Sequence, residues 1–332
     1  MTASPVFVSA EASAAVFHWG EAVRTLQSAY SAPEQPASTP PRTVARGSQS
    51  WLRCLPAIPS TGRYFGAKLM GRSNSATVPG AEYVIVLFDR ETSSIAAIVD
   101  ANLITGYRTA ATSAAALDRM ATPGAARLAV LGSGLEASMH VRAFAAVRPL
   151  EEVVVFSPTP ARREAFAETM AAELGVKCRA VAEPEEAVDG ATIALAAARS
   201  RGEQPILFGE WLRHDSLVVS IGSTVPEQRE LDVSVVARSD FIVCDMLEEV
   251  LHETGDMIAA AVDGIDVAGR AFSLSALMRG EIEPERLAAS SPMYKSVGGG
   301  LQDVVIAEMV LGRALEAGLA TPLPISFLKK GS

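Results

Sequence analysis

The sequence predicts an α/β protein that combines a doubly wound parallel sheet with a second, discontinuous α+β domain. Three observations lead to this fold class. A glycine-rich turn joins an apolar strand to a helix within residues 127–144, apolar strands then alternate with helical or loop segments as far as residue 244, and residues 42–100 form short segments separated by turns. Alternating strands and helices are typical of parallel sheets, whereas short strands joined by turn residues are typical of antiparallel ones.

The glycine-rich turn has the pattern of a dinucleotide-binding site. Gly132 allows a sharp turn after the strand, Gly134 leaves room for a pyrophosphate, and Ala137 is small enough for the helix to pack on the strand. The helix N-terminus offers free N–H groups to phosphate. An ordinary turn that uses glycine only for backbone freedom is the alternative, but a second strand follows about 20 residues later, as a Rossmann domain requires. The predicted cofactor-binding residues here are Gly132, Ser133, Gly134, Leu135, Glu136 and Ala137.

The residues after the second strand favour NADP(H) over NAD(H). An NAD site usually ends this strand with a carboxylate that binds the ribose hydroxyls. This chain has Ser157, Thr159 and Arg162 there, with no carboxylate before Glu164. Hydroxyl groups and a guanidinium can bind a 2′-phosphate that a carboxylate would repel. NADP(H) is therefore the preferred cofactor and NAD(H) a possible one, although arginines on a first helical turn can also be merely solvated.

Composition excludes several classes of function. The chain has 332 residues, of which 49% are hydrophobic and 20% charged, and its net charge is −9, so no attraction to nucleic acid is expected. Three widely spaced cysteines suit a reducing compartment, and no segment resembles a signal peptide or a membrane span, so we expect a cytoplasmic protein. The four histidines lie outside any metal-ligand pattern, so no metal is expected.

The segments indicate where the two domains meet. An amphipathic helix at residues 11–30 precedes a proline-rich loop, four β segments and an alanine-rich helix that begins near Thr105 and closes at Pro123-Gly124. The last apolar helix, residues 302–318, lies beyond the final Rossmann strand and is expected to return to the first domain. We therefore expect a substrate-binding and dimerisation domain at residues 1–120 and 303–332, and a Rossmann domain at residues 121–302. The expected strands are residues 42–53, 64–70, 83–89 and 94–100 in the first domain, and 128–131, 153–156, 177–181, 193–196, 217–221 and 241–244 in the second.

Several motifs resemble those of the ornithine cyclodeaminase and mu-crystallin family. Their order and spacing match over nearly the whole chain. This resemblance implies a homodimer built through the N-terminal domain, with the active site in the cleft that faces the nicotinamide. The motifs are Gly66-Ala67-Lys68-Leu69, Tyr107-Arg108-Thr109-Ala110-Ala111-Thr112-Ser113, the glycine turn, Pro205-Ile206-Leu207-Phe208-Gly209-Glu210-Trp211, Arg229-Glu230-Leu231-Asp232 and Lys295-Ser296-Val297-Gly298.

The resemblance implies that Arg42, Lys68 and Arg108 hold a substrate carboxylate. A guanidinium can grip a carboxylate with two hydrogen bonds, and a lysine adds a point charge. The lysine can also donate a hydrogen bond or pass a proton, and in this way it helps to keep an imine nitrogen protonated. Each cation taken alone could be a surface charge, and Arg42 is the least securely aligned. The resemblance further places the cofactor against Thr109, and its nicotinamide against Gly222, Ser223 and Gly298.

One position departs from the cyclodeaminases of the family, which resemble one another in carrying an aspartate where this chain has Thr224. A threonine hydroxyl is a poor general base near neutral pH. The resemblance therefore favours an imine or ketimine reductase, or an amino-acid dehydrogenase, in which the reduced cofactor delivers hydride to the carbon of a C=N bond beside a carboxylate. Cyclic imino acids and amines coupled to 2-oxo acids are both possible substrates. A cyclodeaminase with tightly bound NAD and a non-enzymatic binding protein remain alternatives.

Overall fold

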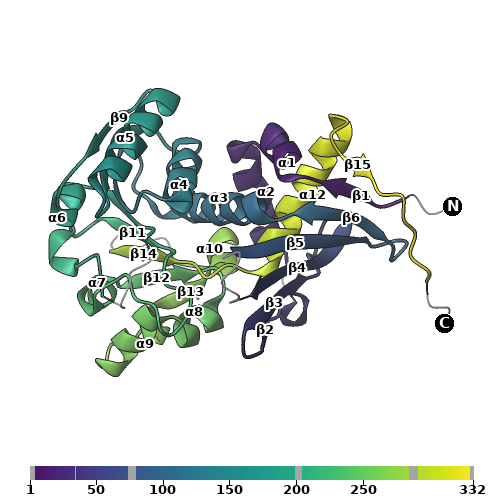
Figure 1. Cartoon of the computed structure of the whole chain (residues 1–332). Coiled ribbons are helices and arrows are strands. Elements are labelled where there is room, and N and C mark those ends of the chain that lie inside the picture. Colours follow the sequence, from purple (N-terminus) through teal and green to yellow (C-terminus); the bar gives the residue numbers. More distant parts are fainter. Residues whose placement is uncertain (1–3, 34, 74–79, 199–203, 284–290, 330–332) are drawn as a thin grey trace. The chain divides into compact units, whose positions relative to one another are not determined.

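The computed structural model describes residues 4–33, 35–73, 80–198, 204–283 and 291–329. The chain divides into two compact units (Figure 1). Unit 1 comprises Met1–Arg108 and Gly299–Ser332, and unit 2 comprises Thr109–Gly298. The helix α3 (Asn102–Met120) belongs to both units, because its first turns contact unit 1 and its later turns contact unit 2. The division therefore falls inside α3, twelve residues before the boundary expected at residue 120.

Unit 1 is built on a seven-stranded mixed sheet in the order β15-β1-β6-β5-β4-β3-β2. Neighbouring strands run antiparallel except β1 and β6, which are parallel. Residues 42–53 were expected to form one segment, but they lie in the hairpin of β2 and β3. The strands β1 and β15, which lie next to each other at one side of the sheet, were not predicted. The strands are β1 (Val6–Val8), β2 (Thr43–Arg46), β3 (Ser50–Ala57), β4 (Tyr64–Ser73), β5 (Gly80–Asp89), β6 (Ile95–Asp100) and β15 (Thr321–Pro322).

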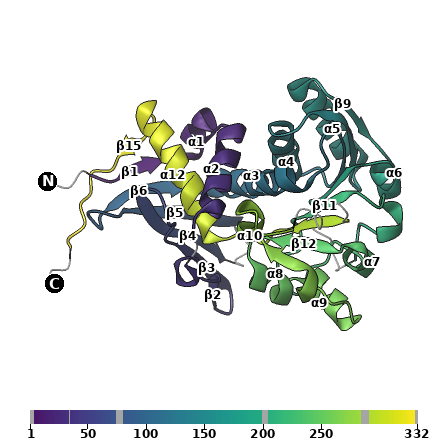
Figure 2. The same cartoon turned by 180° about the vertical axis from the view of Figure 1, so that it is seen from behind.

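Three helices cover one face of this sheet. The last helix, α12 (Gly300–Glu316), packs on the sheet, and α1 (Ala10–Val16) and α2 (Trp19–Ser31) pack on α12, as both views show (Figures 1 and 2). The expected single helix at residues 11–30 is therefore interrupted, because Phe17 and His18 adopt extended backbone. A Cβ atom on Gly300 would lie 2.4 Å from the carbonyl oxygen of Pro56, so only glycine permits this close approach of α12 to β3.

Unit 2 contains an eight-stranded, all-parallel sheet in the order β13-β12-β14-β11-β10-β7-β8-β9. The predicted doubly wound sheet is confirmed, but β14 enters between β11 and β12, and neither β13 nor β14 was predicted. The strands are β7 (Ala126–Leu131), β8 (Leu150–Phe156), β9 (Lys177–Ala180), β10 (Ile193–Ala196), β11 (Leu217–Ser220), β12 (Phe241–Cys244), β13 (Ala271–Ser273) and β14 (Pro292–Lys295).

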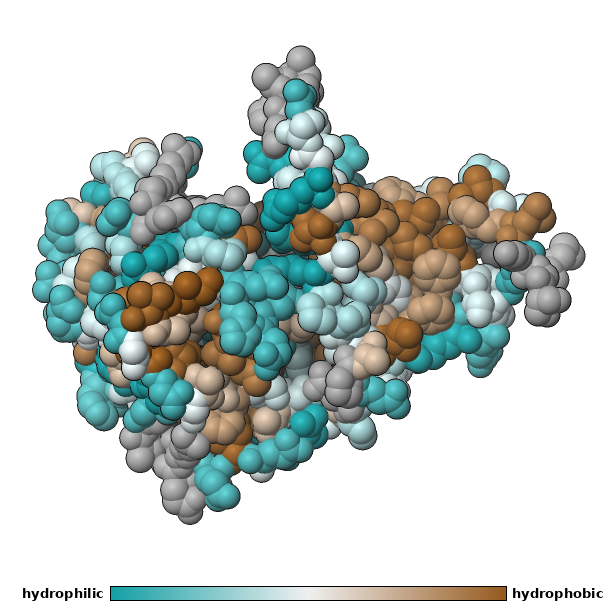
Figure 3. Space-filling model, turned by 90° about the horizontal axis from the view of Figure 1, so that it is seen from below, coloured by the Kyte–Doolittle hydropathy of each residue, from teal (hydrophilic) through white to brown (hydrophobic). Residues whose placement is uncertain are grey.

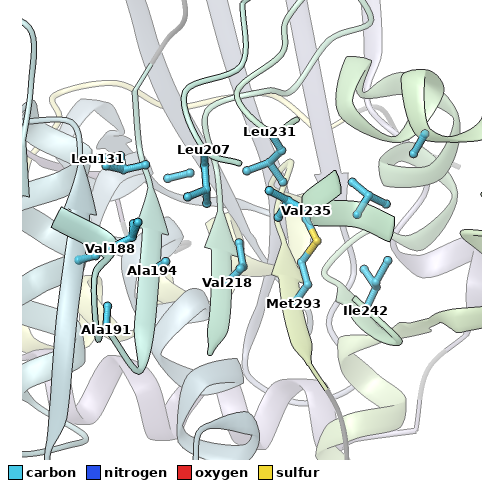
Figure 4. Close-up of a cluster of buried hydrophobic side chains, with 14 of the residues drawn as sticks. Leu131, Val188, Ala191, Ala194, Leu207, Val218, Leu231, Val235, Ile242 and Met293 are labelled. Atoms are coloured by element: carbon cyan, nitrogen blue, oxygen red, sulfur yellow. The ribbon is translucent and has the colours of Figure 1, made fainter. Parts of the chain in front are cut away.

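Helices flank the parallel sheet, and a buried apolar cluster joins them to it (Figure 4). The cluster takes side chains from successive strands, such as Ala194, Val218 and Met293, and from the segments above them, such as Leu207 and Leu231. Because both faces of these strands are buried, their residues are apolar without alternation, except for Ser220 at the end of β11. The unit 2 helices are α4 (Leu135–Ala145), α5 (Pro160–Leu174), α6 (Pro184–Val188), α7 (Val233–Arg238), α8 (Leu247–Glu253), α9 (Gly255–Val262) and α10 (Leu274–Met278).

Candidate functional site

The turn between β7 and α4 has the geometry of a phosphate-binding loop. Gly132 has a φ of +124°, and a Cβ atom there would lie 2.6 Å from the carbonyl oxygen of Ala197. Gly134 is the N-cap of α4, and no side chain there caps the first N–H groups of the helix. A Cβ atom on Gly134 would have no neighbouring atom within 4 Å. Ala137 is fully buried. The first N–H groups of α4 therefore stand beside open space, which fits a pyrophosphate at this turn.

The residues proposed to select the cofactor lie together at the end of β8. The hydroxyl of Ser133 donates to Ser157 Oγ at 2.9 Å, which joins the glycine turn to the neighbouring strand end. Thr159 is the N-cap of α5 and is exposed, as is Arg162 on the first turn of that helix. Arg163 instead donates to the carbonyl oxygen of Ser157 at 3.0 Å and so supports the backbone.

The other predicted residues of the glycine turn have unequal surroundings. Leu135 is 57% exposed at the start of α4, whereas Glu136 is half-buried. The carbonyl oxygen of Glu136 accepts a hydrogen bond from Nδ1 of the buried His140 at 2.7 Å, and the other ring nitrogen of His140 lies 3.0 Å from Ser113 Oγ. The Ser113 hydroxyl also lies 3.0 Å from the carbonyl oxygen of Thr109. This chain of contacts fixes α4 against α3.

The loops expected to border the nicotinamide follow two adjacent strands, β11 and β14. The N–H of Gly222 donates to Glu230 Oε1 at 2.7 Å, and Ser223 donates to the carbonyl oxygen of Gln228. The N–H of Gly298 donates to Asp245 Oδ2 at 2.9 Å, and Gly298 has a φ of +81°. The fold thus brings these loops to one end of the parallel sheet, where ligands bind in doubly wound proteins. Thr224 follows in the first loop and is half-buried.

Two predicted carboxylate-binding residues meet inside unit 1 around an aspartate. Lys68 Nζ donates to Asp303 Oδ1 at 2.8 Å, and Arg108 Nε lies 3.0 Å from the same oxygen as an ion pair without hydrogen-bond geometry. Arg108 also donates to Gln302 Oε1 at 2.8 Å, and Gln302 Nε2 donates to the hydroxyl of Tyr30. All five side chains are buried. One carboxylate therefore faces two cations in this cluster.

Burial changes the proton affinity of the lysine. The pKa of Lys68 is lowered to about 8, first by burial and then by the neighbouring Arg108 charge, with Asp303 acting in the opposite direction. A lysine of ordinary pKa would stay protonated throughout the physiological range. Lys68 can instead gain or lose a proton near neutral pH, a property that suits a group in contact with a reacting acid.

The sheet register places Arg42 on the side of the sheet that carries Lys68. Leu55 lies opposite Lys68, and Thr43 lies opposite Cys54, so Arg42 immediately precedes the β2 ladder at the level of Leu55. Because side chains opposite each other in antiparallel strands share a face, Arg42 extends the row that contains Lys68. It lies two strands from Lys68 and is half-buried.

Asp303 and Gln302 in unit 1 were not predicted from the sequence, and no role was predicted for Glu230 and Lys295 in unit 2. One signal was available: Asp303 interrupts an apolar helical segment and occupies its buried face. A charge at such a position is expected only when a partner balances it.

In the part of the chain that the structure describes, no group of three histidine, cysteine or acidic side chains could hold a metal ion, and no helix is long and apolar enough to cross a membrane.

Comparison with known proteins decides the family. The model of the ornithine cyclodeaminase/mu-crystallin family matches residues 7–318. The chain belongs to this family. The resemblance inferred from the sequence motifs is thereby confirmed.

The relatives of the chain include reductases. Ketimine reductase mu-crystallin of Mus musculus is 31% identical over 284 residues, which cover 84% of this chain and 86% of the relative. Iminosuccinate reductase of Paracoccus denitrificans is 31% identical over 246 residues, or 73% of each chain. The structure of Thermococcus litoralis Δ1-pyrroline-2-carboxylate reductase in complex with NADH and L-proline has a TM-score of 0.86 and 24% identity, and the match covers 96% of this chain and 100% of that one. That likeness confirms the predicted fold class.

Proposed function

We propose that this protein is an NAD(P)H-dependent oxidoreductase that reduces the C=N bond of an imino acid at the carbon next to its carboxylate. One observation carries the proposal: Lys68 and Arg108 are buried side by side and share Asp303 as their carboxylate. A buried pair of cations with one anion favours a second anion, and the carboxylate of an imino acid supplies it. The reductases among the relatives support the same reaction type.

In this proposal, residues of unit 1 bind the substrate and residues of unit 2 bind the cofactor. Arg108 and Arg42 bind the substrate carboxylate, and Lys68 orients it and donates a hydrogen bond. Asp303 holds Lys68 and Arg108 at a fixed spacing through its Oδ1 atom. When bound, the reduced cofactor supplies a hydride for the imine carbon. The chain's part is to orient the substrate and shape the electric field, since orientation and preorganised charge are the main contributions of the protein in such reactions.

The reaction can be tested directly. We expect purified protein to oxidise NADPH in the presence of cyclic imino acids, or of a 2-oxo acid with ammonia or methylamine, as followed by the loss of reduced-nicotinamide absorbance. Conversion of ornithine to proline without added reductant would instead indicate a cyclodeaminase. Tight cofactor binding without turnover of any of these substrates would indicate a binding protein. Either of the last two results would overturn the proposal.

The proposal includes a preference for NADP(H), with the 2′-phosphate held by Ser157, Thr159 and Arg162. Replacing Arg162 with alanine should lower the ratio of NADPH to NADH affinity by roughly 10- to 100-fold, because a charged hydrogen bond to phosphate contributes about 1.5–3 kcal/mol. Dissociation constants from quenching of protein fluorescence provide the measurement. Arg213→Ala, which removes an exposed arginine paired with Asp215, is the matched control and should leave the ratio unchanged. An unchanged ratio in Arg162→Ala would argue for a solvated arginine.

The proposal also includes a homodimer formed through the sheet of unit 1. The sheet face away from α12 is apolar and only half-buried, and a broad hydrophobic surface is visible at the right of Figure 3. A surface of this kind usually marks an interface, and identical sheets can pack face to face about a two-fold axis. The side chains on this face are Phe7, Leu52, Cys54, Pro56, Phe65, Ala67, Leu69, Val84, Val86, Phe88 and Ile98.

Val86 provides a test of the dimer because it lies on the central strand β5 of this face, opposite Ala67 and Ile98. We expect Val86→Glu to yield a monomer, since two copies of a carboxylate would be buried at the interface without partners. Light scattering coupled to size-exclusion chromatography would give the mass, and circular dichroism would verify folding. Val262→Glu, at a residue that is 82% exposed in unit 2, is the control. A dimer that persists in folded Val86→Glu would contradict this interface.

The cysteines support a cytoplasmic location within the proposal. Cys54 and Cys178 are half-buried, Cys244 is buried, and all three are free thiols. Burial raises the pKa of each thiol, so the reactive thiolate is disfavoured. Such cysteines are typical of proteins that function in a reducing compartment.

A further inference from the structure

A cluster of buried charges lies beneath the loop of Gly222 in unit 2. Lys295 at the end of β14 donates from Nζ to Ser220 Oγ at 2.6 Å and to Asp256 Oδ2 at 2.9 Å. The Ser220 hydroxyl donates to Glu230 Oε1 at 2.5 Å, and Lys295 Nζ lies 3.6 Å from that oxygen. Lys295, Asp256, Glu230 and Ser220 are all buried. The function proposed above leaves this cluster without a role.

Glu230 connects this cluster to the backbone of the loop. Its Oε1 atom accepts the N–H of Gly222 at 2.7 Å, and its Oε2 atom would lie 2.1 Å from a Cβ atom on Gly222. Oε2 is buried and has no hydrogen-bond partner among the described residues. Asp256 Oδ1 meanwhile accepts the N–H groups of Glu230 and Leu231, at 2.9 and 3.0 Å. The carboxyl of Glu230 is thus held directly against Gly222.

The cluster changes charge by one when Glu230 takes up a proton. With Lys295, Asp256 and Glu230 all ionised its net charge is −1, and with Glu230 protonated the net charge is zero. The pKa of Glu230 is raised to about 7, chiefly by burial, with the Lys295 charge opposing this shift and the Asp256 charge adding to it. Cys244, the last residue of the neighbouring strand β12, is the register partner of Lys295, and the charges of Lys295 and of the next residue, Asp245, both act on its thiol. Burial raises the pKa of the Cys244 thiol and so keeps it neutral, whereas the carboxyl of Glu230 can gain or lose a proton near neutral pH.

An arrangement of this kind is costly if it only stabilises the fold. Several buried ionisable groups lose their hydration, and apolar residues of similar volume often serve stability as well or better. A buried charge next to the Gly222 loop can contribute to the reaction if the charge of the ligand bound at that loop changes during the reaction. Hydride transfer causes such a change in charge. A C–H bond of the reduced ring breaks, a C–H bond forms at the imine carbon, and the C=N electron pair moves to nitrogen. The positive charge thereby passes from the iminium to the nicotinamide ring.

We propose that Glu230, resting on Lys295 and Asp256, is an electrostatic positioning residue that stabilises the oxidised, positively charged nicotinamide relative to the reduced one. This inference rests on the proposed function and on the nicotinamide position against Gly222 that the family resemblance implies. An ionised Glu230 attracts the ring cation formed by the transfer, and the fixed loop keeps the charge in place. Glu230 acts through the Gly222 backbone and exchanges no proton with the substrate.

The ratio of two cofactor affinities tests the inference without any imino acid. Dissociation constants for NADP⁺ and NADPH should be measured by fluorescence or calorimetry from pH 6 to pH 8.5. As Glu230 ionises, the ratio of the NADP⁺ constant to the NADPH constant should fall by roughly threefold to tenfold. Titration of the 2′-phosphate affects both forms alike and cancels in the ratio. Glu230→Gln keeps an acceptor for Gly222 and should give a ratio that does not change with pH.

Two further variants separate charge from folding. Glu230→Asp retains the ionisable group and should restore a pH-dependent ratio even if overall affinity decreases. Glu152→Gln removes another buried carboxylate, which pairs with Arg127, Lys177 and Arg179 near the opposite end of the parallel sheet, and should keep the pH dependence of the unmodified protein. If both cofactor forms bind but the ratio is constant with pH in the unmodified protein, the inference is wrong and the proposed function stands. If neither form binds, both are wrong.

Discussion

Replacing Lys68 with methionine is expected to lower kcat/KM for the imino acid by about 100- to 1000-fold while NADPH affinity stays unchanged. Lys68 supplies a charged hydrogen bond in a buried setting, and losing about 3–4 kcal/mol of transition-state binding has an effect of this size. Methionine has a similar length and suits the buried site, and Arg108 then remains to balance Asp303. The fold should therefore survive the change.

The pH profile gives an independent check on Lys68. Its pKa of about 8 implies that the unmodified enzyme loses kcat/KM as pH rises through 8, because the neutral amine no longer attracts the carboxylate. Lys68→Met should show no such decrease. Lys177→Met, which removes a lysine that is 72% exposed and paired with Glu152, is the control and should retain full activity. Normal activity in Lys68→Met would remove Lys68 from the proposed site.

Replacing Asp303 with asparagine should lower the free energy of unfolding by about 3–5 kcal/mol at pH 7, because Lys68 and Arg108 would lose the buried carboxylate that faces both of them. The loss should be smaller at pH 9 than at pH 6, since Lys68 can shed its proton in the folded state and so remove one buried charge. Urea unfolding followed by circular dichroism at the two pH values would measure the effect.

A second substitution makes the Asp303 experiment specific to charge. Adding Lys68→Met to Asp303→Asn should return part of the lost stability, because one of the two unbalanced cations is then absent. Asp215→Asn removes a carboxylate that is 57% exposed and paired with Arg213, and it should change stability by no more than about 0.5 kcal/mol. Equal losses in Asp303→Asn and Asp215→Asn would contradict the balancing role of Asp303.

Local sequence was sufficient to predict those features of the candidate site that are formed by consecutive residues. The turn from Gly132 to Ala137 requires a sharp bend, open space and a small residue at fixed spacing, and all three requirements are visible in the sequence. The motifs around Lys68 and Arg108 likewise identified the family that comparison confirmed. The interruption of the first helix at Phe17 and His18 left no comparable signal, because helical spacing of apolar residues continues across it.

Contacts between distant segments were beyond such local reasoning. Asp303 lies 235 residues from Lys68 in the chain, and only the docking of α12 on β4 brings them to 2.8 Å. The cluster of Glu230, Asp256 and Lys295 likewise depends on β14 entering the sheet beside β11, a strand order that periodicity does not encode.

By itself, therefore, the sequence determined the fold class and the family, and it identified the residues that are proposed to bind the dinucleotide and the substrate carboxylate. These features follow from backbone freedom, side-chain size and residue type at short spacing. Only the tertiary structure decided which carboxylates balance those cations and which lie beneath Gly222. The physical reason is that a buried charge must find its partner in space, and the partner can come from any part of the chain.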